Sequence, residues 1–259
     1  MIRSLQLYAE ECAAAIRASF SDRANFAIQV SGMFINNVVF LGLWWLFFAG
    51  FRTVGGWGLP DLALLMGLTM TVVGLCGVFL GGYRDMAAAI LRGEMETLLT
   101  QPRGILGRML ARESMATAWG DVIGGILVLA LGARLAPAQV APVLLALAIG
   151  VAVYASSAVA FASMAFWIAG ARSFARDLTD FTLLFSSYPP SIYQGAVKVL
   201  AFTVLPAGFV VVLPVRMVRH PGWDTAGLAA LGAVAWIGIA AGLFAVGFSR
   251  YRRGVAPTP

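Results

Sequence analysis

Lysine and histidine are almost absent from this chain, and their scarcity excludes several kinds of site. The only lysine, Lys198, precedes Val199, whereas a phosphate-binding P-loop needs a lysine followed by serine or threonine. We therefore expect no ATP-hydrolysing site in this chain. The only histidine, His220, cannot supply the paired imidazoles of a zinc site. As the base of a catalytic triad it would need a serine and an acid brought near by the fold, so a solvated loop histidine is the favoured interpretation.

Cysteines, and acidic residues within the apolar runs, are also scarce. Cys12 lies in a polar segment and Cys76 in the middle of an apolar run, so we expect no disulfide between them, and two cysteines make no metal-ligand set. Asp121 is the only acidic residue well inside an apolar run, which leaves no aspartate pair for intramembrane proteolysis. We predict no catalytic residue, no metal site and no bound cofactor. Residues 1–26 lack a compact apolar core and are not expected to be a signal peptide.

Apolar residues, in contrast, are abundant: the chain is 60% hydrophobic and only 12% charged. Several apolar runs reach the roughly 20 residues that cross a bilayer core of about 30 Å. We predict an all-α polytopic membrane protein with six transmembrane helices. An amphipathic interfacial helix at residues 1–26 precedes a transmembrane domain at 27–259. The predicted spans are 27–48, 62–82, 107–131, 140–169, 174–192 and 226–248, with 105 and 115 as alternative starts of the third.

The basic residues are distributed unevenly between the two sides of these predicted spans. With the N-terminus inside, 13 of the 18 basic residues fall on the inner side and 5 on the outer side. Because basic loops stay in the cytoplasm, this bias predicts that both termini are cytoplasmic. An even number of spans, such as six, satisfies that arrangement.

The segment 83–104, between the second and third predicted spans, carries a concentration of charge. Apolar residues recur between its charged ones at helical spacing, Gly93 interrupts the pattern, and Pro102 with Gly104 ends it. We predict a helical elbow lying on the membrane surface. An ordinary amphipathic loop between two spans is the alternative interpretation.

Within the elbow, GEMETLLTQP resembles the cytosolic loop of ABC-2 transporter permeases, which has a Gly-acidic-x-acidic-x-Leu-Leu-x-x-Pro pattern. The resemblance implies a coupling helix that docks on a separate ATPase subunit. It also implies a multi-pass protein of the bacterial plasma (inner) membrane. The residues that it assigns to coupling are Arg92, Gly93, Glu94, Met95, Glu96, Leu98, Leu99 and Pro102.

A second resemblance to the same family lies in SYPPSIYQGAVKVLAFTVLPAGFVVVLPV. A branch of ABC-2 permeases has a similar pattern before its last span, which implies six spans and an outer re-entrant segment, here 195–215. Placing the fifth span at 196–215 instead would expose the apolar run FTLLFSSYPP to water. Pro190 departs from the pattern and leaves the end of the fifth span open. The matching residues include Tyr188, Pro189, Gly195, Pro206, Phe209 and Pro214.

Three polar residues inside predicted spans are candidates for lining a transport pathway. An ionisable group in hydrocarbon usually faces a cavity or a partner, so Asp121 could line the route. Alternatively the third span begins late, and Asp121 lies near the headgroups. Asn36 and Asn37 could line the same route, but hydrogen bonds between helices explain them equally well.

The resemblance implies the permease subunit of an ATP-driven exporter of a drug, a lipid or a glycan. We expect a second permease, identical or related, two copies of a separate ABC ATPase that binds ATP and Mg, and no nucleic acid. An ion-coupled secondary transporter is an alternative, although no internal repeat is clear. A non-transporting scaffold is compatible with the same sequence. A membrane-embedded enzyme acting on lipid is disfavoured, because the chain has no clustered catalytic side chains.

Overall fold

The computed structural model describes residues 2–51, 53, 56–96 and 104–254. The chain is all-α, as predicted: 83% of it is helical, and the described residues include no strand. The α-helices are α1 (Ile2–Ser19), α2 (Arg23–Gly50), α3 (Leu59–Phe79), α4 (Met86–Leu91), α6 (Ile105–Ala111), α7 (Ala116–Leu131), α8 (Val140–Ser163), α9 (Ala171–Ser186), α10 (Gly195–Thr203), α11 (Leu213–Arg219) and α12 (Trp223–Arg252).

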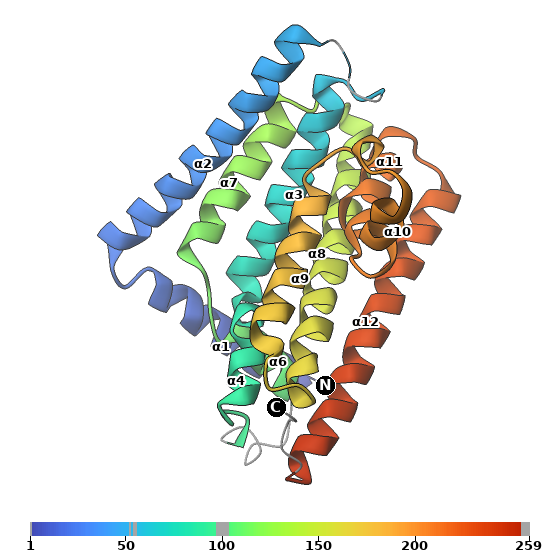
Figure 1. Ribbon diagram of the computed structural model, residues 1–259. Helices are drawn as coiled ribbons and strands as arrows, with labels where there is room; N and C mark the ends of the chain where they lie inside the picture. Colours follow the sequence, from blue (N-terminus) through green and yellow to red (C-terminus); the bar gives the residue numbers. More distant parts are fainter. Residues whose placement is uncertain (1, 52, 54–55, 97–103, 255–259) are drawn as a thin grey trace.

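Helices α2, α3, α7, α8, α9 and α12 run along the long axis of the molecule (Figure 1). The start of α1, the end of α12, α4 and α6 lie at one end, and α10 and α11 lie towards the other. We call these the terminal end and the far end. Among the described residues, four helices are long and apolar enough to cross a membrane, or five if one bent pair forms a single span. Because α9 has only 16 residues, the six-span count stays a prediction.

That bent pair lies where we predicted a single third span over 107–131. Helices α6 and α7 meet at 81°, and α7 begins at Ala116, close to the later of the two predicted starts. The Met115 N–H donates to the carbonyl of Gly77 in α3 at 3.0 Å, so this backbone bonds across to α3 instead of continuing a helix. Gly82, in the 3₁₀ turn at Gly81–Arg84, lets α6 pack closely against that turn, because a Cβ there would lie 1.9 Å from the Met109 carbonyl oxygen.

Helix α3 is the centre of the bundle and is buried along almost its whole length. A helix that is apolar on all sides needs neighbours all round, and α7, α8 and α9 pack against it. Small residues bring these helices close together. A Cβ on Gly125 of α7 would lie 2.7 Å from the Thr71 backbone nitrogen of α3. Helix α2 is different: it is strongly apolar but mostly exposed.

The predicted re-entrant segment, 195–215, contains α10, a short π-helical turn and the start of α11. Gly195 begins α10 with a φ of +57°, a conformation that favours glycine. The Pro206 carbonyl accepts from the Phe209 and Val210 N–H groups, both at 2.9 Å. The Phe209 ring lies against α12, where a Cβ on Gly232 would be 2.1 Å from it. These contacts describe the packing of the segment, and its depth in a membrane stays a prediction.

Arg219, at the end of α11, joins three segments at the far end. Its Nε lies 2.9 Å from Oδ1 of Asp61 in α3. Its Nη2 donates to the carbonyls of Pro60 at 2.7 Å and Ala133 at 3.1 Å. One guanidinium therefore holds α11 against the start of α3 and the segment after α7.

Candidate functional site

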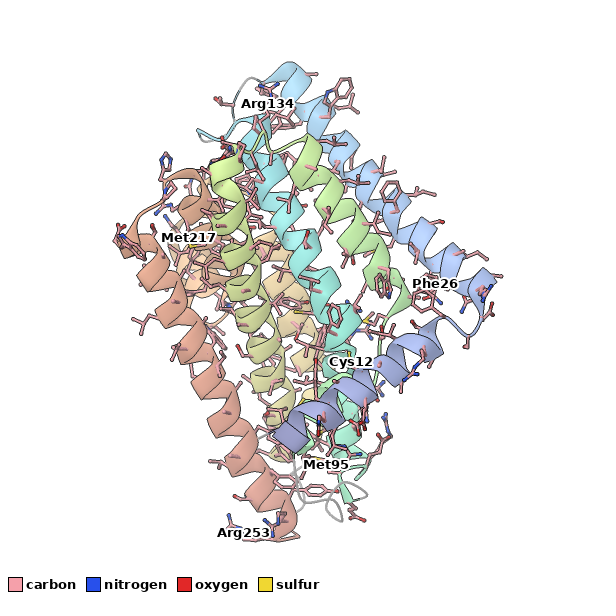
Figure 2. All side chains as sticks on the ribbon, turned by 180° about the vertical axis from the view of Figure 1, so that it is seen from behind. Cys12, Phe26, Met95, Arg134, Met217 and Arg253 are labelled. Atoms are coloured by element: carbon pink, nitrogen blue, oxygen red, sulfur yellow. The ribbon has the colours of Figure 1, made fainter. Side chains whose placement is uncertain are left out.

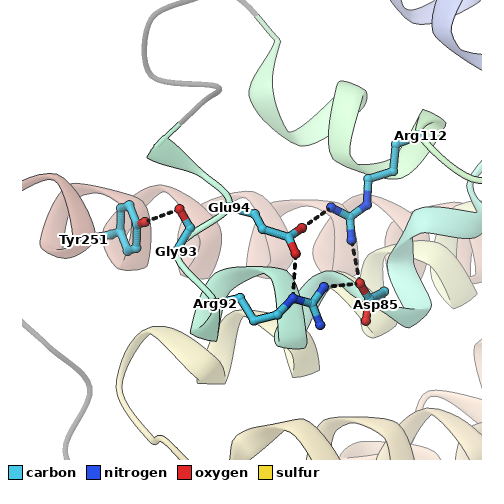
Figure 3. Close-up of polar contacts among 6 residues, drawn as sticks. All are labelled: Asp85, Arg92, Gly93, Glu94, Arg112 and Tyr251. Atoms are coloured by element: carbon cyan, nitrogen blue, oxygen red, sulfur yellow. Dashed lines mark hydrogen bonds and ion pairs between the residues drawn. The ribbon is translucent and has the colours of Figure 1, made fainter.

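The predicted elbow, 83–104, begins within a 3₁₀ turn at Gly81–Arg84 and continues into α4. Gly93 follows α4 with a φ of +75°, which lets the chain change direction. The Tyr251 hydroxyl of α12 donates to the Gly93 carbonyl at 3.1 Å (Figure 3). The elbow is therefore attached directly to the end of the last long helix.

Four side chains of alternating charge form a closed set of ion pairs at the elbow (Figure 3). Arg92 donates to Oδ2 of Asp85 at 2.6 Å and to Oε1 of Glu94 at 2.5 Å. Arg112 donates to the same Asp85 oxygen at 2.9 Å and to Oε2 of Glu94 at 3.0 Å. We call these four residues the elbow ring. Planar guanidinium groups suit such shared carboxylate pairing.

The elbow ring joins parts of the chain that are distant in sequence. Arg112 belongs to the break between α6 and α7, whereas the other three residues belong to the elbow. Hydrogen bonds from Arg92, and then from Arg112, hold the pKa of Glu94 below its ordinary value. The ring therefore links the elbow to the break before α7, and Tyr251 links the elbow to α12.

The other predicted coupling residues have different surroundings. Met95 is fully buried and packs in the apolar cluster that includes Met109, at the terminal end of the molecule (Figure 2). Glu96 is exposed. The remaining three predicted residues, Leu98, Leu99 and Pro102, lie outside the described residues.

Helix α1 is fastened to the same region. Arg108 of α6 pairs with Glu11 of α1 at 2.5 Å, and the Tyr8 hydroxyl donates to the Phe79 carbonyl at 2.8 Å. Burial raises the pKa of Tyr8 to about 12. The amphipathic pattern predicted an interfacial helix, but nothing in the local sequence indicated its partners.

The three predicted pathway residues meet at one cavity of about 370 Å³, which we call the deep cavity. Asn37 donates through Nδ2 to Oδ1 of Asp121 at 2.9 Å, and both residues are buried. Asn36 is exposed. Asp121 lies five residues after the start of α7, so the helix begins late and Asp121 also lies beside a cavity. The cavity is bounded by residues of α2, α3, α7 and α9.

Aromatic side chains bridge α2 and the end of α9 beside the deep cavity. Tyr188, which follows α9, has its ring centre 6.2 Å from that of Phe40 and 5.9 Å from that of Trp44. Helix α9 ends at Ser186, and Pro189, which comes directly after Tyr188, has no backbone N–H with which to continue it. The predicted Tyr-Pro motif therefore lies over the gap between these two helices, on the far-end side.

A model of the family described as "ABC-2 family transporter protein" matches residues 34–254 of the 259 residues. The match includes the elbow, the segment from Tyr188 to Pro214 and every lining residue of the deep cavity except Met33. No curated protein matches the chain. No solved structure matches it either.

Proposed function

Since the chain belongs to the ABC-2 family of transporter proteins, we propose that it is the membrane-spanning permease of an ATP-driven exporter. The family is a membrane transport component and is not itself catalytic. In our proposal a separate ABC ATPase, present in two copies, binds ATP and Mg and works on the cytoplasmic face. The proposed location is the bacterial inner membrane, with both termini cytoplasmic.

The observation that carries this proposal is the elbow ring. Asp85, Arg92, Glu94 and Arg112 connect the elbow, whose helix α4 is buried and whose Arg92 and Glu96 are exposed, to the break before α7. The Tyr251 hydroxyl connects the same segment to α12. Closure of the ATPase pair on ATP would push the elbow, and the ring and the tyrosine would convert that push into movement of long helices.

Each elbow residue has a distinct task in this mechanism. Exposed Glu96 is available to a partner, whereas Glu94 holds the elbow to Arg112. Buried Met95 packs the elbow against the core and so resists its independent movement. In the proposal, the leucines and the proline that end the motif belong to the surface that the ATPase contacts.

The deep cavity is the proposed start of the route. It lies beside the Tyr188 contacts, which close the gap between α2 and α9 towards the far end. Separation of Tyr188 from Phe40 and Trp44 would open that gap. The apolar, exposed side of α2 is available to lipid or to the second permease, which completes the route in this proposal.

Co-purification with ATPase measurement tests the proposal. The chain is expressed with the genes on either side of its own, purified gently and placed in nanodiscs. We expect a stoichiometric P-loop ATPase whose hydrolysis rate changes when Glu94→Gln weakens the ring. The matched variant Glu96→Gln leaves the ring intact and is expected to change subunit association instead. A chain that purifies without any ATPase in every condition would contradict the proposal.

A further inference from the structure

A second cavity, of about 400 Å³, lies next to the deep cavity on the terminal-end side of the bundle. We call it the charged cavity. Tyr83 and Arg84 line both cavities, so these two residues form their boundary. Both volumes fall in the range of small-molecule sites. The ionisable residues that line the charged cavity, besides Tyr83, are Arg84, Asp85, Glu113, Arg172, Arg176 and Asp180.

The charges of this cavity are not equally available. Asp85 is held by Arg92 and Arg112 of the elbow ring, at 2.6 and 2.9 Å. Asp180 is 3.8 Å from Arg176, and Glu113 faces the same cavity. With Asp85 neutralised from outside, three arginines remain against two carboxylates.

Arg84 is the cation best placed to receive a ligand. Its Nε donates to the Tyr83 hydroxyl at 3.3 Å, and within the described part of the chain it makes no ion pair. The residue is exposed at the boundary of the two cavities. The acid of the deep cavity, Asp121, is only 6% exposed and already accepts from Asn37. Of the two charged residues that line the deep cavity, Arg84 is therefore the one more open to a bound molecule.

The walls of the deep cavity are mostly apolar and deformable. Methionine side chains are flexible and polarizable, so they adapt to apolar groups of different shape. A long apolar body could lie here while its polar end remains beside Arg84. The apolar lining residues include Met33, Phe40, Met66, Met70, Val73 and Met115.

We infer that the two cavities together bind an amphiphile with a phosphate headgroup, which is the substrate class of the proposed export. Its apolar body occupies the deep cavity, and its phosphate accepts hydrogen bonds from Arg84, with Arg172 and Arg176 supplying further positive charge. A guanidinium presents two parallel N–H groups that match phosphate oxygens, which a single ammonium does not. This inference rests on the proposed function for its transport meaning, but binding itself needs neither ATP nor a partner.

The test uses the full-length chain in a neutral maltoside detergent and a dodecyl phosphate probe with a photoreactive group on its chain. We expect labelled peptides from α2, α3 and α9. Arg84→Gln should lower labelling about tenfold or more, since the charge-assisted hydrogen bonds to the phosphate are lost. Arg84→Lys should restore only part of it. Arg216→Gln, an exposed arginine of α11 outside both cavities, should leave labelling unchanged.

Two further ligands separate the contribution of the phosphate headgroup from that of the alkyl chain. The same alkyl chain with a trimethylammonium head should label weakly, and equal labelling would overturn the inference in favour of a cation near Asp121. An excess of inorganic phosphate should leave labelling by dodecyl phosphate within about twofold, because burial of the apolar chain supplies much of the affinity. Complete displacement would overturn the inference and indicate a site for free phosphate.

A second variant covers the case in which Arg84→Gln does not fold. The double variant Arg172→Gln/Arg176→Gln changes two exposed residues of α9 and should lower labelling about threefold or more. Unchanged labelling in every arginine variant that folds would overturn the inference. Association with the ATPase, measured on the same variants, should persist. Loss of probe binding and failure of the proposed function are therefore distinguishable.

Discussion

Replacing Asn37 by leucine should destabilise the chain, whereas the same change at the neighbouring Asn36 should not. Asn37 is 6% exposed and donates to Asp121 at 2.9 Å. Leucine cannot donate, so the buried carboxyl group of Asp121 would lose this partner. Asn36 is exposed, and no hydrogen bond from its side chain occurs among the described residues. Both residues are asparagines of α2, but Asn37 is buried and Asn36 is exposed.

Leaving a buried polar group unsatisfied costs about 1–3 kcal/mol. Hydrogen bonds between transmembrane helices average nearer ~0.6 kcal/mol, with a maximum of about 1.7 kcal/mol. Because Asp121 is buried, we expect a loss of about 1–2 kcal/mol in the free energy of unfolding for Asn37→Leu. For a chain of this size that corresponds to a fall in melting temperature of about 2–8 °C.

Thermal unfolding of the two purified variants in the same detergent measures this difference. Asn36→Leu should melt within about 1 °C of the unsubstituted chain, since a surface change of this kind costs little. Asn37→Asp, which also lacks the donor and adds a second carboxyl group, should melt lower than Asn37→Leu. Equal melting of Asn36→Leu and Asn37→Leu would refute the reasoning, because it would mean that the bond to Asp121 does not support the fold.

Three further predictions concern the helix contacts and the elbow ring. Gly82→Ala should abolish the yield of folded protein, because its Cβ would lie 1.9 Å from a backbone oxygen, while Gly42→Ala meets nothing within 4 Å and should fold normally in size-exclusion chromatography. Arg219→Gln should increase proteolysis near α11, and the exposed Arg216→Gln should not. Because the pKa of Glu94 is lowered in the folded chain, the stabilisation from the ring should be present above about pH 4.3 and be lost as pH falls further. Hydrogen-exchange protection of the elbow amides, taken relative to the intrinsic exchange rate at each pH, should fall with it, and protection that stays constant down the whole pH range would contradict this.

The apolar runs of the sequence predicted the long helices well, because each run has the length and uniformity that a bilayer requires. The break between α6 and α7 was not predictable in the same way. Local sequence favours helix on both sides of it, and the Met115 N–H bonds to Gly77 only after α3 is in place. Sequence alone therefore left two candidate starts for the third span, since a tertiary contact decides between them.

The candidate site shows the same division between local pattern and tertiary contact. The family resemblance assigned Arg92 and Glu94 to coupling, but not Arg112, which lies 18 residues after Glu94 and completes the ring. The resemblance also assigned Met95 to coupling, and the structure buries it in the apolar cluster that includes Met109. Asn37 and Asp121 were separate candidates. Their hydrogen bond could not be predicted, because the two residues are 84 positions apart in the sequence and only the fold brings them together.

The measurement that tests the central claim most directly is ATP hydrolysis by the chain co-purified with its neighbouring gene products in nanodiscs. The account predicts a stoichiometric ATPase in the complex. It also predicts a hydrolysis rate that changes by severalfold when Glu94→Gln opens the elbow ring, with the ATPase still bound. An ATPase that stays bound and hydrolyses ATP at the same rate with and without the Glu94 substitution would contradict the elbow ring as the coupling element. The absence of any bound ATPase would contradict the permease assignment itself.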